Sequence, residues 1–333
     1  MKLNLQHARP AGQTEDKTSV RQPRPENVSG DFYVDHTCID CDTCRWMAPD
    51  FFKRANEQSA VLAQPQTDEE RLEAYKALLA CPTFSIHSAN KRPGELKAAS
   101  NAFPSPVAGT SGVYHLGFHS QDSFGSASWL VQRERGNVMM DSPRFDAKLL
   151  ARIKKMGGAK YMLLSHRDDV CDHAKWASAL GLKRIIHKIE INEQQGTDKC
   201  EVLLEGKGPW KLPDSGDDME IIFTPGHTAG HVCLFYKTQK VMFTGDHLAF
   251  RAVRPTEAKP FTSEDDKLSV FDKFNWYKVP LQVENAYKIG TKYDWLHLLP
   301  GHGRPGHFAD EEQRLRAINA LARHYNYEPQ AAA

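Results

Sequence analysis

The stretch Thr224-Pro225-Gly226-His227-Thr228-Ala229-Gly230-His231 says more about the fold of this 333-residue chain than any other. It places two histidines on a turn. The turn follows residues Glu220 to Phe223, whose mainly apolar sequence predicts a strand. Three more segments repeat this design, an apolar run followed by a turn that carries an imidazole or a carboxylate: Leu164 to His173, Phe243 to His247 and Leu299 to Gly303. Turns that follow parallel-running strands converge at one edge of a sheet, so we expect these side chains to form one metal site.

The order and spacing of these motifs resemble a known family. Thr-Pro-Gly-His-Thr-x-Gly-His, Thr-Gly-Asp and Pro-Gly-His-Gly look like the metallo-β-lactamase superfamily, over about residues 105 to 330. The resemblance implies an αββα sandwich with a one- or two-metal site at the edge of its sheets. It also implies that His227 binds the first metal, that Asp246 bridges, and that His302 binds the second.

The first segment departs from the usual pattern of that superfamily, which is His-x-His-x-Asp-His. His166 aligns with the first histidine, Asp168 stands where the second is expected, and Asp172-His173 match the closing pair two residues late. The insertion leaves open that Asp169 replaces Asp168, or that neither binds. The metal ligands that we expect from the resemblance are His166, Asp168, Asp172, His173, His227, Asp246 and His302.

The expected chemistry is hydrolysis. A hydroxide whose pKa the metals lower attacks an ester, thioester, lactone or amide carbonyl. Asp172 and Asp246 are the expected catalytic residues, with Asp172 orienting the hydroxide or binding the second metal. A carboxylate at Asp168 favours iron or manganese, although zinc tolerates carboxylates too. The expected cofactors are therefore one or two divalent ions, zinc or iron, with manganese as a third candidate.

A second set of motifs lies near the N-terminus, where Cys38, Cys41 and Cys44 are spaced three apart and Cys81-Pro82 follows. Three thiolates on so tight a loop cannot all pair as disulfides. Together with Cys81 they are suited to a [4Fe–4S] cluster, and a four-cysteine structural zinc site is the alternative. Residues 31 to 90 also resemble single-cluster bacterial and archaeal ferredoxins, in which Ala-Pro-x-x-Phe follows the cysteine loop and a Cys-Pro follows a helix. The resemblance implies a ferredoxin-like fold.

The presence of both motif sets leaves three functions open. The first is hydrolysis of a small-molecule substrate, with the cluster as an electron-transfer, sensory or structural appendage. The second is an oxidoreductase, in which an electron-donor protein reduces the cluster and the cluster transfers electrons to a non-haem iron site. This alternative is favoured by the carboxylate in the first motif, which the flavodiiron reductases of the superfamily also carry. The third is an iron–sulfur redox sensor or binding protein. Arg251, Arg254 and Arg304 are candidates to hold an anionic substrate group.

The sequence predicts an α+β protein with an N-terminal ferredoxin-like domain and a larger αββα sandwich. We expect a disordered tail at 1–30, the cluster domain at 31–90, a Pro- and Gly-rich linker at 91–112 and the sandwich at 113–333. Apolar patterns predict a hairpin of strands at 127–131 and 137–140. They predict further strands at 161–164, 184–187, 220–223, 232–236, 241–243 and 295–299. They also predict helices from Thr67 to Cys81 and at 145–155, 172–180 and 310–325.

Composition sets limits on partners and location. The 43 basic and 42 acidic residues give a net charge of +1, so we expect no nucleic-acid partner. No run approaches the roughly 20 apolar residues of a membrane span. The N-terminus lacks the apolar run of a secretory signal, and its acidic residues do not favour a transit peptide. Seven cysteines, four of them clustered, indicate a reducing compartment. We expect a cytoplasmic protein, with the plastid stroma left open.

Overall fold

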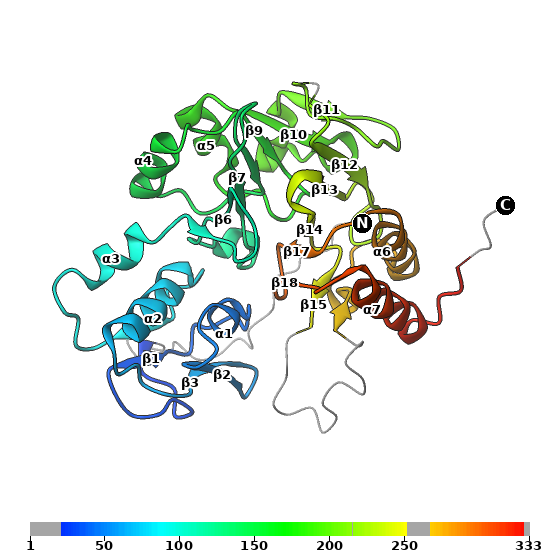
Figure 1. Cartoon of the computed structure of the whole chain (residues 1–333). Helices are drawn as coiled ribbons and strands as arrows, with labels where there is room; N and C mark the ends of the chain where they lie inside the picture. The colour runs from blue at the N-terminus through cyan, green and yellow to red at the C-terminus, as the bar shows by residue number, and fades with distance from the viewer. Residues whose placement is uncertain (1–20, 215, 252–266, 330–333) are drawn as a thin grey trace.

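The computed structural model describes residues 21–214, 216–251 and 267–329 (Figure 1). The larger part is built on two sheets. The first has strand order β11-β10-β9-β8-β7-β6-β5, and the second has order β12-β13-β14-β17-β18. The first sheet comprises β5 (Ser105–Pro106), β6 (Val113–His115), β7 (Trp129–Val131), β8 (Val138–Met140), β9 (Tyr161–Leu163), β10 (Lys183–His187) and β11 (Val202–Leu204). The second comprises β12 (Met219–Phe223), β13 (Val232–Tyr236), β14 (Val241–Gly245), β17 (His297–Pro300) and β18 (Gly306–His307).

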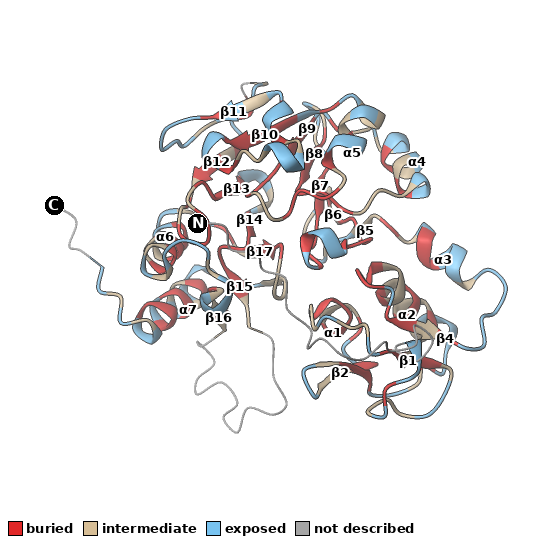
Figure 2. Cartoon of the chain, turned by 180° about the vertical axis from the view of Figure 1, so that it is seen from behind, coloured by how far each residue is buried: buried red, intermediate tan, exposed pale blue. Residues whose placement is uncertain are grey.

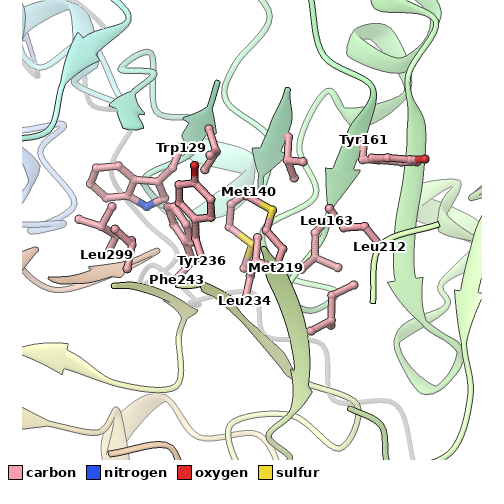
Figure 3. Close-up of a cluster of buried hydrophobic side chains, with 14 of the residues drawn as sticks. Trp129, Met140, Tyr161, Leu163, Leu212, Met219, Leu234, Tyr236, Phe243 and Leu299 are labelled. Carbon is pink, nitrogen blue, oxygen red and sulfur yellow. The ribbon is translucent and has the colours of Figure 1, made fainter. Parts of the chain in front are cut away.

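The two sheets pack face to face, and side-chain alternation explains how. In β8, Val138 and Met140 point into the core between the sheets, whereas Met139 points to the opposite face. Successive side chains of a strand leave opposite faces of the sheet, so a strand that is apolar throughout is buried on both. The inner core contains Trp129, Leu163, Leu234, Phe243 and Leu299 (Figure 3).

Helices cover the outer face of each sheet, where Figure 2 shows their inward sides buried. Helices α4 (Ala147–Lys155) and α5 (His173–Leu180) pack on the first sheet, and α6 (Val279–Lys292) and α7 (Glu311–His324) pack on the second. A short pair, β15 (Ala249–Phe250) and β16 (Leu268–Ser269), lies beside the second sheet. The αββα sandwich that the sequence predicts is confirmed, and so is the hairpin of β7 and β8.

The N-terminal domain has its own core. Strand β1 (Phe32–Val34) pairs with β4 (Ile86–Ser88), and β2 (Phe52–Ala55) pairs with β3 (Gln58–Val61). Helix α1 (Thr43–Met47) begins inside the cysteine loop, and α2 (Asp68–Ala80) ends at Cys81. The predicted start of α2 is confirmed, because Thr67 and Glu70 form a reciprocal capping box.

Two segments differ from the expectation of a tail and a linker. Within the predicted tail, Arg24 is 3% exposed and donates to the carbonyls of Ser59 and Ala55, so residues 21–30 pack on the domain. Residues 1–20 lie outside the described residues. The predicted linker 91–112 contains helix α3 (Glu95–Asn101) and strand β5, which pairs with β6 in the large sheet. Pro and Gly mark turns, and they do not show whether the chain between them packs on a neighbour.

Among the described residues, no helix combines the length and the apolar character that crossing a bilayer requires.

Candidate metal centres

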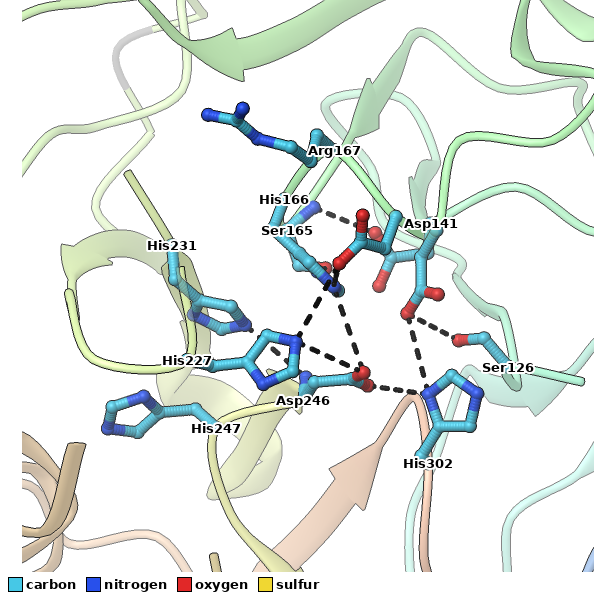
Figure 4. Close-up of polar contacts among 12 residues, drawn as sticks. Ser126, Asp141, Ser165, His166, Arg167, His227, His231, Asp246, His247 and His302 are labelled. Carbon is cyan, nitrogen blue, oxygen red and sulfur yellow. Dashed lines mark hydrogen bonds and ion pairs between the residues drawn. The ribbon is translucent and has the colours of Figure 1, made fainter. Parts of the chain in front are cut away.

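The metal-ligand candidates follow strand ends that meet at one edge of the sandwich (Figure 4). Strands β12, β14 and β17 run in the same direction, since β13 is antiparallel to both β12 and β14, and β14 is parallel to β17. His227, Asp246 and His302 come after these three strands. The loop from His166 to Asp169 follows β9 in the opposite sheet. The convergence predicted from the sequence motifs therefore occurs in the structure.

One group of ligand atoms surrounds a single point. Oδ2 of Asp246 lies 3.7 Å from Nε2 of His166 and 3.5 Å from Nε2 of His227. Oδ2 of Asp168 lies 3.6 Å and 3.9 Å from the same two nitrogens. Ligands bound to one ion at about 2.0–2.2 Å in a tetrahedron lie about 3.4 Å from one another. These separations are long for hydrogen bonds and suitable for four ligands of one ion.

A second group shares Asp246. Its Oδ1 accepts a hydrogen bond of 2.8 Å from Nδ1 of His302, and Oδ2 of Asp169 lies 4.0 Å from that nitrogen. Because Asp246 directs one oxygen to each group, it is placed to bridge two ions. Gly301 keeps this second group open, since a Cβ there would lie 2.8 Å from Asp169 Oδ2 and 3.0 Å from Asp246 Oδ1.

Several polar atoms of these residues are buried without any hydrogen-bond partner among the described residues. They are Nε2 of His166, Oδ2 of Asp168, Oδ1 of Asp169, Nε2 of His227 and Nε2 of His302. Buried polar atoms without partners are costly, and three carboxylates facing one another repel. Burial raises the pKa of Asp168 and of Asp169 above the ordinary value. A divalent cation in the first group would satisfy Nε2 of His166, Oδ2 of Asp168 and Nε2 of His227 and neutralise the carboxylates, so the residues present fit a metal.

The structure does not bring Asp172 and His173 into either group, so this part of the prediction needs correction. The Asp172 carboxylate accepts a hydrogen bond from the amide of Phe145 and pairs with Lys175 at 2.7 Å. The His173 ring contacts the carbonyl of Gln195 on one side and Arg184 on the other. Asp172 has a φ of 49°, in the left-handed region, and α5 starts directly after it. The pair begins the helix and lies beyond the metal loop.

Side chains that the motifs did not single out position the ligands. Ser126 donates a 2.7 Å hydrogen bond to Oδ2 of Asp169. Asp141, which follows β8, accepts a 2.7 Å hydrogen bond from the amide of Ser165, the residue before His166. Glu190 accepts from the amides of Arg167 and Gly230, and so ties two ligand loops together. An acidic residue directly after an apolar strand could have revealed Asp141, but nothing local distinguishes Ser126.

His231 and His247 lie behind the ligands. Nε2 of His231 accepts a hydrogen bond from the amide of Asp246, and its Nδ1 contacts the Thr224 hydroxyl at 3.1 Å. Both nitrogens of His231 are therefore occupied, and the ring orients the bridging aspartate. His247 packs beside His231 with its ring centroid 5.4 Å away. Burial lowers the pKa of both rings, so both are neutral at pH 7.

The four clustered cysteines line one pocket in the N-terminal domain. All of them have free thiols, and Cys44 and Cys81 are buried. The amides of Ser59 and Ser85 each donate at 3.3 Å to a sulfur, that of Cys38 and that of Cys81. Burial, and next the neighbouring Cys81, raises the pKa of Cys41 to about 12. Burial this deep disfavours the thiolate form unless a positive partner neutralises it, and amide-to-sulfur hydrogen bonds are typical of iron–sulfur sites.

Comparison with known proteins agrees with both sites. Residues 34–88 match the family of 4Fe-4S single-cluster domains of ferredoxin I, and residues 168–304 match the metallo-β-lactamase superfamily. One chain therefore contains a single-cluster ferredoxin domain and a metallo-β-lactamase domain. The first match fits an iron–sulfur cluster better than a zinc site.

Individual relatives align with part of the chain. A hydroxyacylglutathione hydrolase of Mesorhizobium japonicum is 35% identical over 128 residues, which are 37% of this chain and 48% of that protein. One of Klebsiella pneumoniae is 28% identical over 35% of this chain and 45% of its own length. The chain thus spans about half the length of these relatives. Among solved structures, a metallo-β-lactamase from Pontibacter korlensis matches 65% of this chain and 97% of its own, with 19% identity and a TM-score of 0.42.

Proposed function

We propose that this chain, which joins a single-cluster ferredoxin domain to a metallo-β-lactamase domain, is a metal-dependent hydrolase with two adjacent metal sites. His166, Asp168 and His227 would hold one ion, Asp169 and His302 the other, and Asp246 both. The convergence of buried ligand atoms that lack other partners carries this proposal. Iron and zinc both suit the set, and its three carboxylates favour iron more than a three-histidine site would.

The expected reaction is attack of water on an activated carbonyl. Bound metals supply a Lewis acid and lower the pKa of water. The protein's part is to hold the ligands rigidly: Ser126 fixes the Asp169 carboxylate, His231 fixes the backbone of Asp246, and Asp141 fixes the loop that carries His166. Hydrogen bonds that orient metal ligands commonly alter affinity or activity by about 10- to 100-fold. Asp172 is not part of this machinery.

Thioesters are the first substrates to test. Two relatives that match part of this chain are named hydroxyacylglutathione hydrolases, and an acyl-glutathione is a thioester. The suggestion that Arg304 holds an anionic substrate group is not supported, because its guanidinium pairs with Asp42 at 2.7 Å and 3.1 Å. Arg254 lies outside the described residues. The seven free cysteines fit a reducing compartment, and we propose the cytoplasm.

The test combines metal analysis with a substrate panel. Anaerobically purified protein should contain iron and sulfide of one cluster plus up to two further divalent ions. It should hydrolyse an S-acylglutathione faster than a lactone or an anilide. His227→Ala should lower kcat/KM by about 10²- to 10³-fold, the range seen when an electrostatic contact to the transition state is removed.

His324→Ala, which changes an exposed histidine of α7, is the matched control and should leave kcat/KM unchanged. A fully metal-loaded protein that cleaves none of these substrates faster than the metal-free protein does would refute hydrolysis.

A further inference from the structure

The cysteine loop of the N-terminal domain lies directly against the loop Ser120–Ser126 of the metal domain. The Thr43 hydroxyl is 3.1 Å from Nδ1 of His119 and 3.5 Å from the carbonyl of Gly125. A Cβ placed on Gly125 would lie 2.8 Å from Cβ of Cys41 and 3.2 Å from its sulfur. Only a residue without a side chain allows this approach, and Gly125 also has a φ of 90°. The backbone of Gly125 therefore touches a ligand of the cluster.

The next residue touches a ligand of the metal centre. Ser126 donates its 2.7 Å hydrogen bond to Oδ2 of Asp169. The amide of Ala127 donates at 2.7 Å to the carbonyl of Gly301, the residue before His302. The backbone of Gly125 and the hydroxyl of Ser126, two consecutive residues, thus join one ligand of each centre.

This contact limits the distance between the two centres. The two contacts and the bonds between them, from Cys41 Sγ through Cα of Gly125 and Oγ of Ser126 to Asp169 Oδ2, add up to about 15 Å at most. The rate of electron tunnelling falls exponentially with distance, and it is fast between protein cofactors at separations of this order. A bonded path with one hydrogen bond and one van der Waals contact couples centres better than the same distance through empty space.

An ion pair fixes the two loops against each other. Asp42, between Cys41 and Thr43, accepts two hydrogen bonds from Arg304, which lies two residues after His302. Asp42 also accepts from Arg45 at 2.5 Å and is 7% exposed. A buried carboxylate held by two guanidinium groups has a fixed position. The ligand loop of the cluster is thus anchored to the ligand loop of the second metal group.

We propose that Gly125 and Ser126 form an electron path between the cluster and the metal centre, which gives this chain a redox activity besides hydrolysis. An external low-potential one-electron donor reduces the cluster from [4Fe–4S]²⁺ to [4Fe–4S]⁺. The reduced cluster passes that electron to a ferric ion at the Asp169–Asp246–His302 group, which becomes ferrous, and the cluster returns to its oxidised state. The inference depends on the proposed metal site and not on hydrolysis.

The test compares two anaerobic preparations with equal cluster content, one loaded with ferric iron at the metal centre and one with zinc. Each receives one electron equivalent of dithionite per chain and is frozen for EPR. In the zinc protein the signal of the reduced cluster should persist. In the ferric protein it should be at least tenfold weaker, and the ferric signal should fall in step. An electron that stays on the cluster in the ferric protein overturns the proposal.

A variant of the docking ion pair tests whether the path depends on the contact between the two loops. Arg304→Gln should slow the transfer at least tenfold in freeze-quench kinetics while the contents of cluster and metal stay unchanged. Arg316→Gln, a partly exposed arginine of α7 that pairs with Glu312, is the matched control and should transfer like the unaltered protein. Transfer at full rate in Arg304→Gln would show that this docking does not carry the electron.

The two proposals fail in different ways. A metal centre that takes up neither iron nor zinc contradicts the metal site itself. Metal uptake with thioester hydrolysis, but with the electron retained on the cluster, contradicts only the electron path.

Discussion

Asp168 and Asp169 are neighbours in the chain, yet their carboxylates face different ligand groups. Oδ2 of Asp168 lies within 4 Å of His166 and His227, whereas Oδ2 of Asp169 lies beside His302 and accepts from Ser126. The sequence left open which of the two replaces the missing histidine. The structure indicates that each has its own position, and that Asp172 and His173 lie in neither group.

We therefore expect different losses of metal from three single substitutions. Asp168→Asn should release the ion held with His166 and His227, and Asp169→Asn the ion held with His302, so each variant should keep about half of the bound metal. Inductively coupled plasma mass spectrometry after dialysis measures this ratio per chain. Asp172→Asn should keep full metal content, because that carboxylate accepts a hydrogen bond from the amide of Phe145 and pairs with Lys175, away from both metal groups.

A loss of metal in Asp172→Asn equal to that in Asp169→Asn would restore the motif-based ligand set. The sequence could not decide this point, since the register depends on Ser126, which lies 43 residues before Asp169. Spacing within a motif predicts which residue types meet. It does not predict which of two adjacent carboxylates a distant serine will fix.

At the scale of elements, helix α3 shows where composition misleads. Its segment has the proline and glycine content of a linker, but Arg71 of α2 holds it in place. The Arg71 guanidinium, 6% exposed, binds both oxygens of Glu95 and one oxygen of Asp31. Its hydrogen bonds with Glu95 are the main reason that the pKa of this carboxyl falls to about 2. The apolar periodicity of a segment can predict that it forms a helix or strand. It cannot predict that α3 packs on α2, because this depends on Arg71, 24 residues before Glu95.

Arg71→Met should lower the free energy of unfolding by about 2–3 kcal/mol, because two largely buried carboxylates lose their shared cation. Denaturant titration measures it, and an NMR titration should show the pKa of Glu95 rising toward 4.5. Lys188→Met is the control: its pair with Glu205 is exposed, so the change should stay within about 0.5 kcal/mol. Equal losses in the two variants would mean that the Arg71 network does not hold α3.

At the scale of the whole molecule, the two domains share an interface that neither motif set predicted. The sequence identified both domains, their order and most of the sandwich strands, because cysteine spacing and apolar runs are local. It did not reveal that Trp46 of α1 packs against the core between the sheets, with its ring centroid 5.0 Å from that of His115. Met47 and Leu79 pack against cores of both domains. A contact between residues this far apart leaves no pattern in either segment.

This interface predicts that the holo-protein unfolds as one unit, and Asp42 is the residue that tests it. Asp42→Ala leaves the guanidiniums of Arg45 and Arg304 without their shared carboxylate, which should weaken domain docking by about 3 kcal/mol. Differential scanning calorimetry under anaerobic conditions should then show two transitions where the unaltered protein shows one. Asp50→Ala, an exposed change in the same domain, should keep a single transition. Two transitions in the unaltered protein would contradict the coupling, because they would mean that the contacts between the domains do not link their unfolding.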